Sequence, residues 1–287
     1  MIDDRSIPRL AAWVLRHDRL QFSAFGRVVA DQAWERVTNR ENALHRDGNH
    51  AWVGPGTPIS AAGIAELARA QRSEGSTPCL DLYGEPDDRD ALMIECGFRL
   101  DELSPSALLA WKSSVHDGVA GDGIAGDGFA GDGAGHRPSV VGKRAGHRPS
   151  VVEVPRERWP VVVGQVNPGK LEPMWRRVVE AESRMVCARF FAVFVGDLAV
   201  SRCALYDWQD AVQIESVATH PDFRRLGYAR EMLETVLAAS RSPVYLLVTA
   251  SNEAAINLYK SMGGVVLHSS LTRRYRAAAP SSALRIA

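Results

Sequence analysis

The chain has 287 residues, of which 46% are hydrophobic and 24% are charged, a composition typical of soluble globular proteins. It carries 34 basic and 34 acidic residues, so it lacks the basic excess expected of a nucleic-acid-binding protein. The most apolar run, over 190–195, is too short to span a bilayer. We therefore expect neither a nucleic acid nor a membrane as partner, and the length favours about two domains.

The cysteines and the first residues indicate the compartment. Four cysteines lie far apart, with no Cys-x-x-Cys pair, at Cys79, Cys96, Cys187 and Cys203. This spacing predicts free thiols in a reducing compartment and no metal site. The opening stretch Met1–Arg5 is acidic and begins no long apolar run, so it does not resemble a signal peptide. We expect a cytoplasmic protein.

Alternation and turn residues predict a mixed α+β domain over residues 1–115. Strands are expected over 25–30, 35–39, 49–53, 79–83 and 107–112, and helices over 60–72 and 90–96.

The middle of the chain is repetitive. A five-residue Gly/Asp repeat starts at Asp117, and the sequence His-Arg-Pro-Ser-Val-Val occurs at both 136–141 and 147–152. Such a glycine-rich stretch buries little and costs much entropy to order, so it predicts a flexible linker over 116–153. A calcium site formed by the aspartates is the alternative, but their spacing fits no calcium loop. The linker interpretation predicts that deletion of 117–150 leaves folding and activity near normal.

The C-terminal part, 154–276, predicts a second α+β domain, followed by a disordered tail over 277–287. A helix is expected over 170–184, and strands over 189–195, 198–206 and 211–219. A helix containing Ala229 and Leu233 follows, then an apolar strand over 243–249, a helix through Tyr259 and a last strand from Val265.

The turn between the third of these strands and the next helix suggests phosphate binding. It reads Arg224-Arg225-Leu226-Gly227-Tyr228-Ala229. A helix N-terminus offers unpaired N–H groups and the positive end of the helix dipole. Gly227 would let a phosphate approach the backbone, and the two arginines would add charge at the rim. An ordinary strand-to-helix turn is the alternative, since such turns also favour glycine.

Two motifs together are more specific. The stretch from Glu215 to Phe223 with this loop, and the string of Asn252, Ala255, Leu258, Tyr259 and Gly263, resemble the motifs of the GCN5-related N-acetyltransferases (GNATs). The resemblance covers 154–276. It implies the GNAT fold, a three-layer arrangement in which helices flank a mixed, mostly antiparallel sheet. It also implies acetyl-CoA as cosubstrate, with no metal.

The resemblance also assigns residues. The pantetheine arm would bind the backbone of Val217, Ala218 and Thr219, and the pyrophosphate would bind the amides from Arg225 to Arg230. The residues expected to bind acetyl-CoA are Val217, Ala218, Thr219, Arg224, Arg225, Leu226, Gly227, Tyr228, Ala229, Arg230 and Asn252. Tyr259 matches the general acid that protonates the leaving thiolate, and Glu215 is the candidate general base. A core tyrosine, and a glutamate that faces solvent or pairs with an arginine, are the alternatives.

The expected activity is transfer of an acetyl group to a primary amine by direct attack. A non-catalytic acetyl-CoA sensor or interaction module is the alternative, although a sensor would not need the Tyr259 phenol. The strand before Asn252 has Leu247 where enzymes that acetylate protein N-termini often have glutamate, which argues against a ribosomal-protein acetyltransferase. The acceptor, a small-molecule or peptide amine, and the oligomeric state stay open.

The N-terminal half resembles a degenerate copy of the same fold, so a tandem arrangement is expected. The stretch from Pro78 to Gly97 has nearly the same proline-to-glycine spacing as that from Pro243 to Gly263. Met93 stands where Tyr259 stands, and no arginine-glycine loop precedes the helix over 60–72. An unrelated α+β domain is the alternative.

Overall fold

The computed structural model describes residues 7–30, 34–43, 45, 48–101, 105–111, 150–168 and 172–278. The helices are α1 (Ile7–Phe25), α2 (Ala61–Ser73), α3 (Asp88–Glu95), α4 (Trp159–Val166), α5 (Pro173–Ser183), α6 (Tyr228–Ala239) and α7 (Glu253–Ser261). The strands are β1 (Arg27–Ala30), β2 (Glu35–Thr38), β3 (Ala51–Val53), β4 (Cys79–Tyr83), β5 (Phe98–Leu100), β6 (Ser106–Trp111), β7 (Val151–Val154), β8 (Ala188–Val195), β9 (Leu198–Asp207), β10 (Val212–Thr219), β11 (Val244–Thr249) and β12 (Val265–Ala277).

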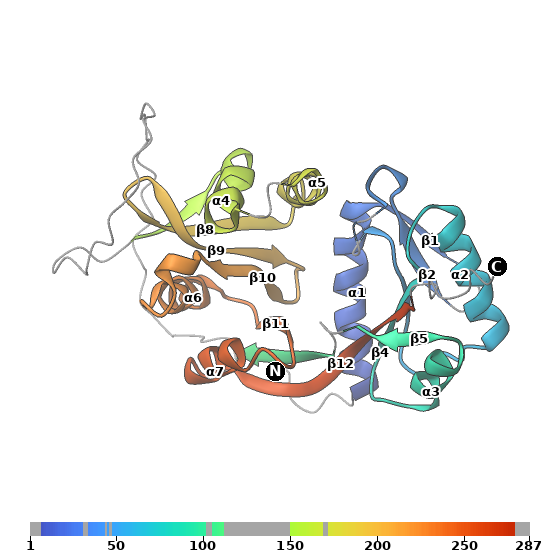
Figure 1. Ribbon diagram of the computed structural model, residues 1–287. Helices are drawn as coiled ribbons and strands as arrows, with labels where there is room; N and C mark the ends of the chain where they lie inside the picture. The colour runs from blue at the N-terminus through green and yellow to red at the C-terminus, as the bar shows by residue number, and fades with distance from the viewer. Residues whose placement is uncertain are drawn as a thin grey trace.

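All of these strands join one 12-stranded sheet in the order β1-β2-β3-β4-β12-β6-β11-β10-β9-β8-β7, with β5 paired to β12. Two pairs are parallel, β3 with β4 and β10 with β11. The other pairs are antiparallel. The expectation of a mixed, mostly antiparallel sheet flanked by helices is confirmed (Figure 1).

The two halves of the chain exchange strands. β6 comes from the N-terminal part of the chain but lies between β11 and β12 and pairs with both. β12 pairs with β6 between Val265 and Thr272, with register shifts within this pairing. From Thr272 on, β12 pairs with β4 and β5 of the N-terminal part. Figure 1 shows β12 running from α7 in one half into the other. The boundary expected at residue 115 therefore does not separate two independent sheets.

Helices cover both faces of the sheet. On one face, α6 and α7 pack Leu233, Val236 and Tyr259 against Val212 and Ile214 of β10. On the other face, α4 and α5 cover β8 and β9, and α1 covers β6 and β11. Because strand side chains alternate, Gln213 and Glu215 of β10 lie on the face opposite Val212 and Ile214. The described part of the chain contains no helix that is both long and apolar enough to cross a membrane.

Most expected elements are present within a few residues of their predicted bounds. The prediction contained neither α1 nor α4, and it placed 151–153, the start of β7, in the linker. The expected repeats within 112–149 and the tail beyond 278 lie outside the described residues. All four cysteines are free thiols, as predicted.

The path from β6 to β7 limits how far the linker can be shortened. The two strands lie five inter-strand steps apart, or about 24 Å across the sheet. Trp111 and Val151 are also offset along the strand direction, because Trp111 pairs with the first residue of β11 and Val151 pairs near the end of β8. Deletion of 117–150 leaves a connection that spans at most about 21 Å. Contrary to the expectation above, this variant should not fold normally.

A shorter deletion, of 117–136, leaves a connection of about 65 Å and should fold. Thermal denaturation of the two variants beside the full chain measures the difference. Equal melting temperatures for all three would contradict the strand exchange.

Candidate active site

The turn before α6 has an uncapped helix start next to a glycine. Gly227 precedes the helix with φ +93°, in the left-handed region that favours glycine, and no side chain caps the helix start. A Cβ placed on Gly227 would have no heavy atom within 4 Å outside its chain neighbours. The start of α6 thus lacks a side-chain cap and is open on the Cβ side of Gly227, which fits a pyrophosphate.

The arginines of this loop divide into two groups. Arg224 and Arg225 are exposed, and among the described residues the Arg224 side chain makes only a long contact from Nε to the Thr219 carbonyl, at 3.4 Å. Arg230 instead donates to Ser261 Oγ of α7 at 2.6 Å, so its side chain ties α6 to α7. The side chains of Arg224 and Arg225 are thus the ones positioned to contact a phosphate at the rim.

The parallel pair β10 and β11 diverges beside this loop. Only Val212 and Gln213 of β10 pair with β11. A bulge then follows, with Ser216 at φ +55° and its carbonyl held by Arg202 Nη1 at 2.7 Å. From here to Thr219 the β10 backbone has no ladder partner in β11, so Val217–Thr219 lie along the divergence.

Glu215 lies just before the bulge. Its side chain is half-buried, and its Oε1 accepts a hydrogen bond from Gln213 Nε2 at 2.8 Å. Removal of the carboxyl from water raises its pKa to about 8, and the charge of Asp18 adds to the rise. The glutamate pairs with an amide and not with an arginine among the described residues, and a pKa near neutrality suits a general base.

Tyr259 approaches from the opposite face, on α7. It is 5% exposed, and its ring meets Trp111 of β6 edge-on with 6.0 Å between centroids. Burial raises its pKa to about 12, and the charge of Glu215 contributes. No hydrogen bond joins its hydroxyl to another described residue. The phenol therefore stays protonated at neutral pH and is free to donate.

Asn252 has a structural task. Its Oδ1 accepts from the Ala255 N–H at 3.2 Å and caps the start of α7, which carries Tyr259. The structure thus brings the loop, the β10 bulge, Glu215 and Tyr259 to one region and uses the Asn252 oxygen for capping.

Two residues of this region escaped the sequence analysis. Trp111 reaches Tyr259 only because β6 crosses into the C-terminal half, and its Nε1 donates to the Met262 carbonyl at 3.1 Å. Gln213 is buried and contacts Glu215, and its place two residues before Glu215 on the same strand was the one signal in the sequence.

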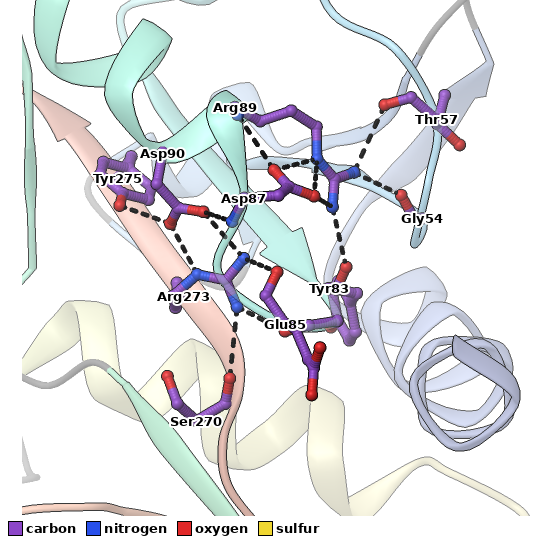
Figure 2. Close-up of polar contacts among 11 residues, drawn as sticks. Gly54, Thr57, Tyr83, Glu85, Asp87, Arg89, Asp90, Ser270, Arg273 and Tyr275 are labelled. Carbon is purple, nitrogen blue, oxygen red and sulfur yellow. Dashed lines mark hydrogen bonds and ion pairs between the residues drawn. The ribbon is translucent and has the colours of Figure 1, made fainter. Parts of the chain in front are cut away.

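The equivalent position in the N-terminal half is closed. There β3 pairs with β4 along its whole length. Beyond the strand ends, the guanidinium of Arg89 donates to the carbonyls of Gly54 at 2.8 Å and Thr57 at 3.3 Å, with a longer contact to Tyr83 at 3.4 Å. Asp87 holds this guanidinium, as Figure 2 shows. Arg89 thus lies beyond the ends of the parallel pair β3 and β4, which corresponds in the N-terminal half to the parallel pair β10 and β11.

Arg273 of β12 completes this polar cluster. It pairs with Asp90 of α3 at 2.6 Å and donates to the carbonyl of Glu85, so the exchanged strand is anchored in the N-terminal half (Figure 2). Among the described residues, no group of three or more His, Cys, Asp or Glu side chains is arranged to hold a metal ion.

Comparison with known proteins agrees with this geometry. Residues 153–263 match the Acetyltransferase (GNAT) family. No curated protein matches the chain significantly.

Several solved structures share the fold over both halves. A GCN5-related N-acetyltransferase from Kribbella flavida is 13% identical with a TM-score of 0.62, and the match covers 96% of each chain. A conserved protein of unknown function from Staphylococcus epidermidis is 12% identical with a TM-score of 0.56, over 88% of this chain and 93% of that one. A GCN5-related N-acetyltransferase from Sphaerobacter thermophilus is 15% identical with a TM-score of 0.53, over 86% and 78%. Residues 153–263 thus match the GNAT family, and the chain as a whole shares the fold of these solved structures.

Proposed function

We propose that the protein transfers the acetyl group of acetyl-CoA to a primary amine by direct attack. The observation that carries the proposal is the uncapped start of α6 at Gly227, which lies beside a divergence between β10 and β11 that Glu215 and Tyr259 approach from opposite faces. The first feature fits a pyrophosphate, and the other two fit a proton acceptor and a proton donor.

The chemistry needs these two groups. The amine nitrogen attacks the thioester carbonyl, a C–N bond forms and the C–S bond breaks. Glu215 takes the proton that the amine loses, directly or through water, and Tyr259 gives its proton to the leaving thiolate. The two raised pKa values suit these roles, since Glu215 gains basicity and Tyr259 keeps its proton. A protein that only sensed acetyl-CoA would need neither group.

Binding of acetyl-CoA tests the first part of the proposal. Acetyl-CoA should raise the melting temperature of the full chain, because a ligand that binds only the folded state stabilises it. Gly227→Glu should abolish this shift by placing a carboxylate where the phosphate binds. Calorimetry should give one site per chain, because Arg89 closes the equivalent position in the N-terminal half.

Gly227→Ala is the matched control, because it shares the backbone strain at φ +93° without adding charge. It should lower the free energy of unfolding of the free protein by about 1 kcal/mol, and with it the melting temperature. It should keep most of the melting-temperature shift that acetyl-CoA causes. Absence of a shift in the wild type would overturn the acetyl-CoA assignment. Two acetyl-CoA sites per chain would contradict the inference that the N-terminal half does not bind acetyl-CoA.

Release of the CoA thiol across a library of amines tests the second part. Amino sugars, polyamines, lysine peptides and small metabolite amines should be included, because the described residues select none of them. Thermal stabilisation by acetyl-CoA together with no release for any amine would favour the sensor.

A further inference from the structure

Helix α1 of the N-terminal half carries two consecutive buried polar residues on the face that covers the candidate site. His17 is 1% exposed and Asp18 is 5% exposed. Buried polar side chains need partners, because an unpaired one costs free energy. In both cases the hydrogen bonds lead toward Glu215 of the C-terminal half. Figure 1 shows α1 standing between the two halves.

A chain of hydrogen bonds joins His17 to Glu215. His17 Nδ1 lies 2.8 Å from the Tyr245 hydroxyl, which donates to Gln213 Oε1 at 3.0 Å. Trp208 Nε1 donates to the same oxygen at 2.7 Å. These two donors fix the orientation of the amide, so that Gln213 Nε2 faces Glu215 and donates to it at 2.8 Å.

Tyr245 has one phenolic proton, and its position decides whether His17 donates or accepts in the hydrogen bond between them. Since Tyr245 gives its proton to Gln213, its oxygen must accept the N–H of His17 Nδ1. Burial lowers the pKa of His17, and Asp210 opposes this fall. Protonation of Nε2, which lies 3.0 Å from the Asp210 carboxylate, adds a donor toward Asp210 and leaves the Nδ1 donor in place. The hydrogen bond to Tyr245 is thus present in both charge states of His17.

Asp18 lies near the same amide. Tyr83 donates to its Oδ2 at 2.7 Å, and the nearby Gln213 side chain acts to lower the pKa of the carboxyl. Burial raises the pKa of Asp18 to about 7. A carboxyl from the N-terminal half therefore lies near both Gln213 and the candidate base of the C-terminal half.

We propose that α1 is a working part of the C-terminal site: His17 is a positioning residue that, through Tyr245, holds the Gln213 amide on Glu215, and Asp18 places a second carboxyl close to Glu215. This role rests on the proposed function, in which Glu215 is the base. The N-terminal half, which lacks an arginine-glycine loop, would then help to orient the candidate base of the C-terminal half as well as contribute strands to the sheet.

The arrangement predicts opposite effects for the two neighbours on α1. Loss of His17 removes the donor that holds the Tyr245 hydroxyl and so loosens the hold on Gln213, whose hydrogen bond lowers the pKa of Glu215, so that pKa should rise. Loss of the Asp18 charge removes a repulsion, so the pKa of Glu215 should fall. The other titratable or charged groups around Glu215, which stay unchanged in both variants, are Glu182 of α5, Arg202 and Tyr206 of β9, Tyr245 of β11 and Tyr259 of α7.

The experiment is a pH titration of the Glu215 carboxyl in the full chain, without ligand, by carbon-13 NMR of glutamate-labelled protein, with Glu215→Gln to assign the signal. His17→Leu should raise the midpoint and Asp18→Asn should lower it, each by about half a unit to one unit. His17→Asn keeps a donor near the Nδ1 position and should restore the midpoint to within a few tenths of a unit of the wild type.

Val14→Ala is the control for loosened packing, because Val14 is fully buried on the same helix and lies outside the hydrogen-bond chain. It should lower the melting temperature and leave the midpoint unchanged. Unchanged midpoints in both polar variants, or shifts in the same direction, would overturn the proposal. If an amine acceptor is found, the acid limb of kcat/KM should move with each midpoint. If none is found, the transferase proposal fails, and the titration still decides the role of α1.

Discussion

Residues 150–278, produced without the N-terminal half, are expected not to fold. The fragment lacks β6, which lies between β11 and β12 and pairs with both. It would lose the buried side chains of Leu108, Leu109 and Trp111 and the partners of the second part of β12. Burial of each such side chain contributes about 1.5–3 kcal/mol, so the loss approaches the whole net stability of a typical domain. Circular dichroism and two-dimensional NMR would measure the outcome.

The control is the full chain cut by a protease between residues 116 and 149 after folding. The cut leaves every strand pair intact, so the two pieces should stay together and keep the melting temperature of the uncut chain within a few degrees. A well-folded isolated fragment that binds acetyl-CoA would show that β6 is dispensable, and it would contradict the strand exchange as a requirement for folding.

Tyr259→Phe is expected to lower kcat about a hundredfold or more once an amine acceptor is identified, because positioned proton donors contribute on this scale. The KM for acetyl-CoA should change less than about threefold, since the loop at Gly227 and the β10 backbone remain. The acid limb of the pH profile, assigned to Glu215, should persist, because the base is untouched. Steady-state kinetics over pH 6 to about 10 would measure both effects, a range below the pKa of Tyr259, which is raised to about 12.

Tyr275→Phe is the matched control. It also removes a hydroxyl from a buried tyrosine, one that donates to Asp90 in the N-terminal half, far from α7 along the sheet. It should reduce stability modestly and leave kcat within about twofold of the wild type. An unchanged kcat in Tyr259→Phe would refute the general-acid role, and equal losses in both variants would point to destabilisation.

The local features of the site could be predicted from the sequence. Gly227 was identifiable because a glycine at a strand-to-helix turn lets a phosphate approach the backbone, and α6 and α7 follow from their apolar periodicity. Its left-handed φ came only from the structure. Glu215 and Tyr259 were found by their positions in two ordered motifs. Their shifted pKa values were beyond prediction, because burial depends on packing between distant segments.

Helix α1 shows the limit most directly. Leu10 and Val14 lie on its buried side, but so do His17 and Asp18, whose polarity is typical of an exposed face. Their burial is tolerated only because Tyr245, Asp210 and Tyr83, which are remote in sequence, satisfy their hydrogen bonds.

The sequence by itself predicted two α+β halves, a phosphate-binding turn at Gly227, and Glu215 and Tyr259 as candidate catalytic groups, because each prediction depends on local backbone preference, short-range spacing or motif position. Only the tertiary structure decided that β6 and β12 pair with strands of the opposite half, that Arg89 lies beyond the ends of β3 and β4, and that α1 reaches the candidate base Glu215. Strand pairing and buried polar contacts depend on which distant segments meet, and a sheet edge accepts any strand that buries its apolar side chains and pairs its backbone.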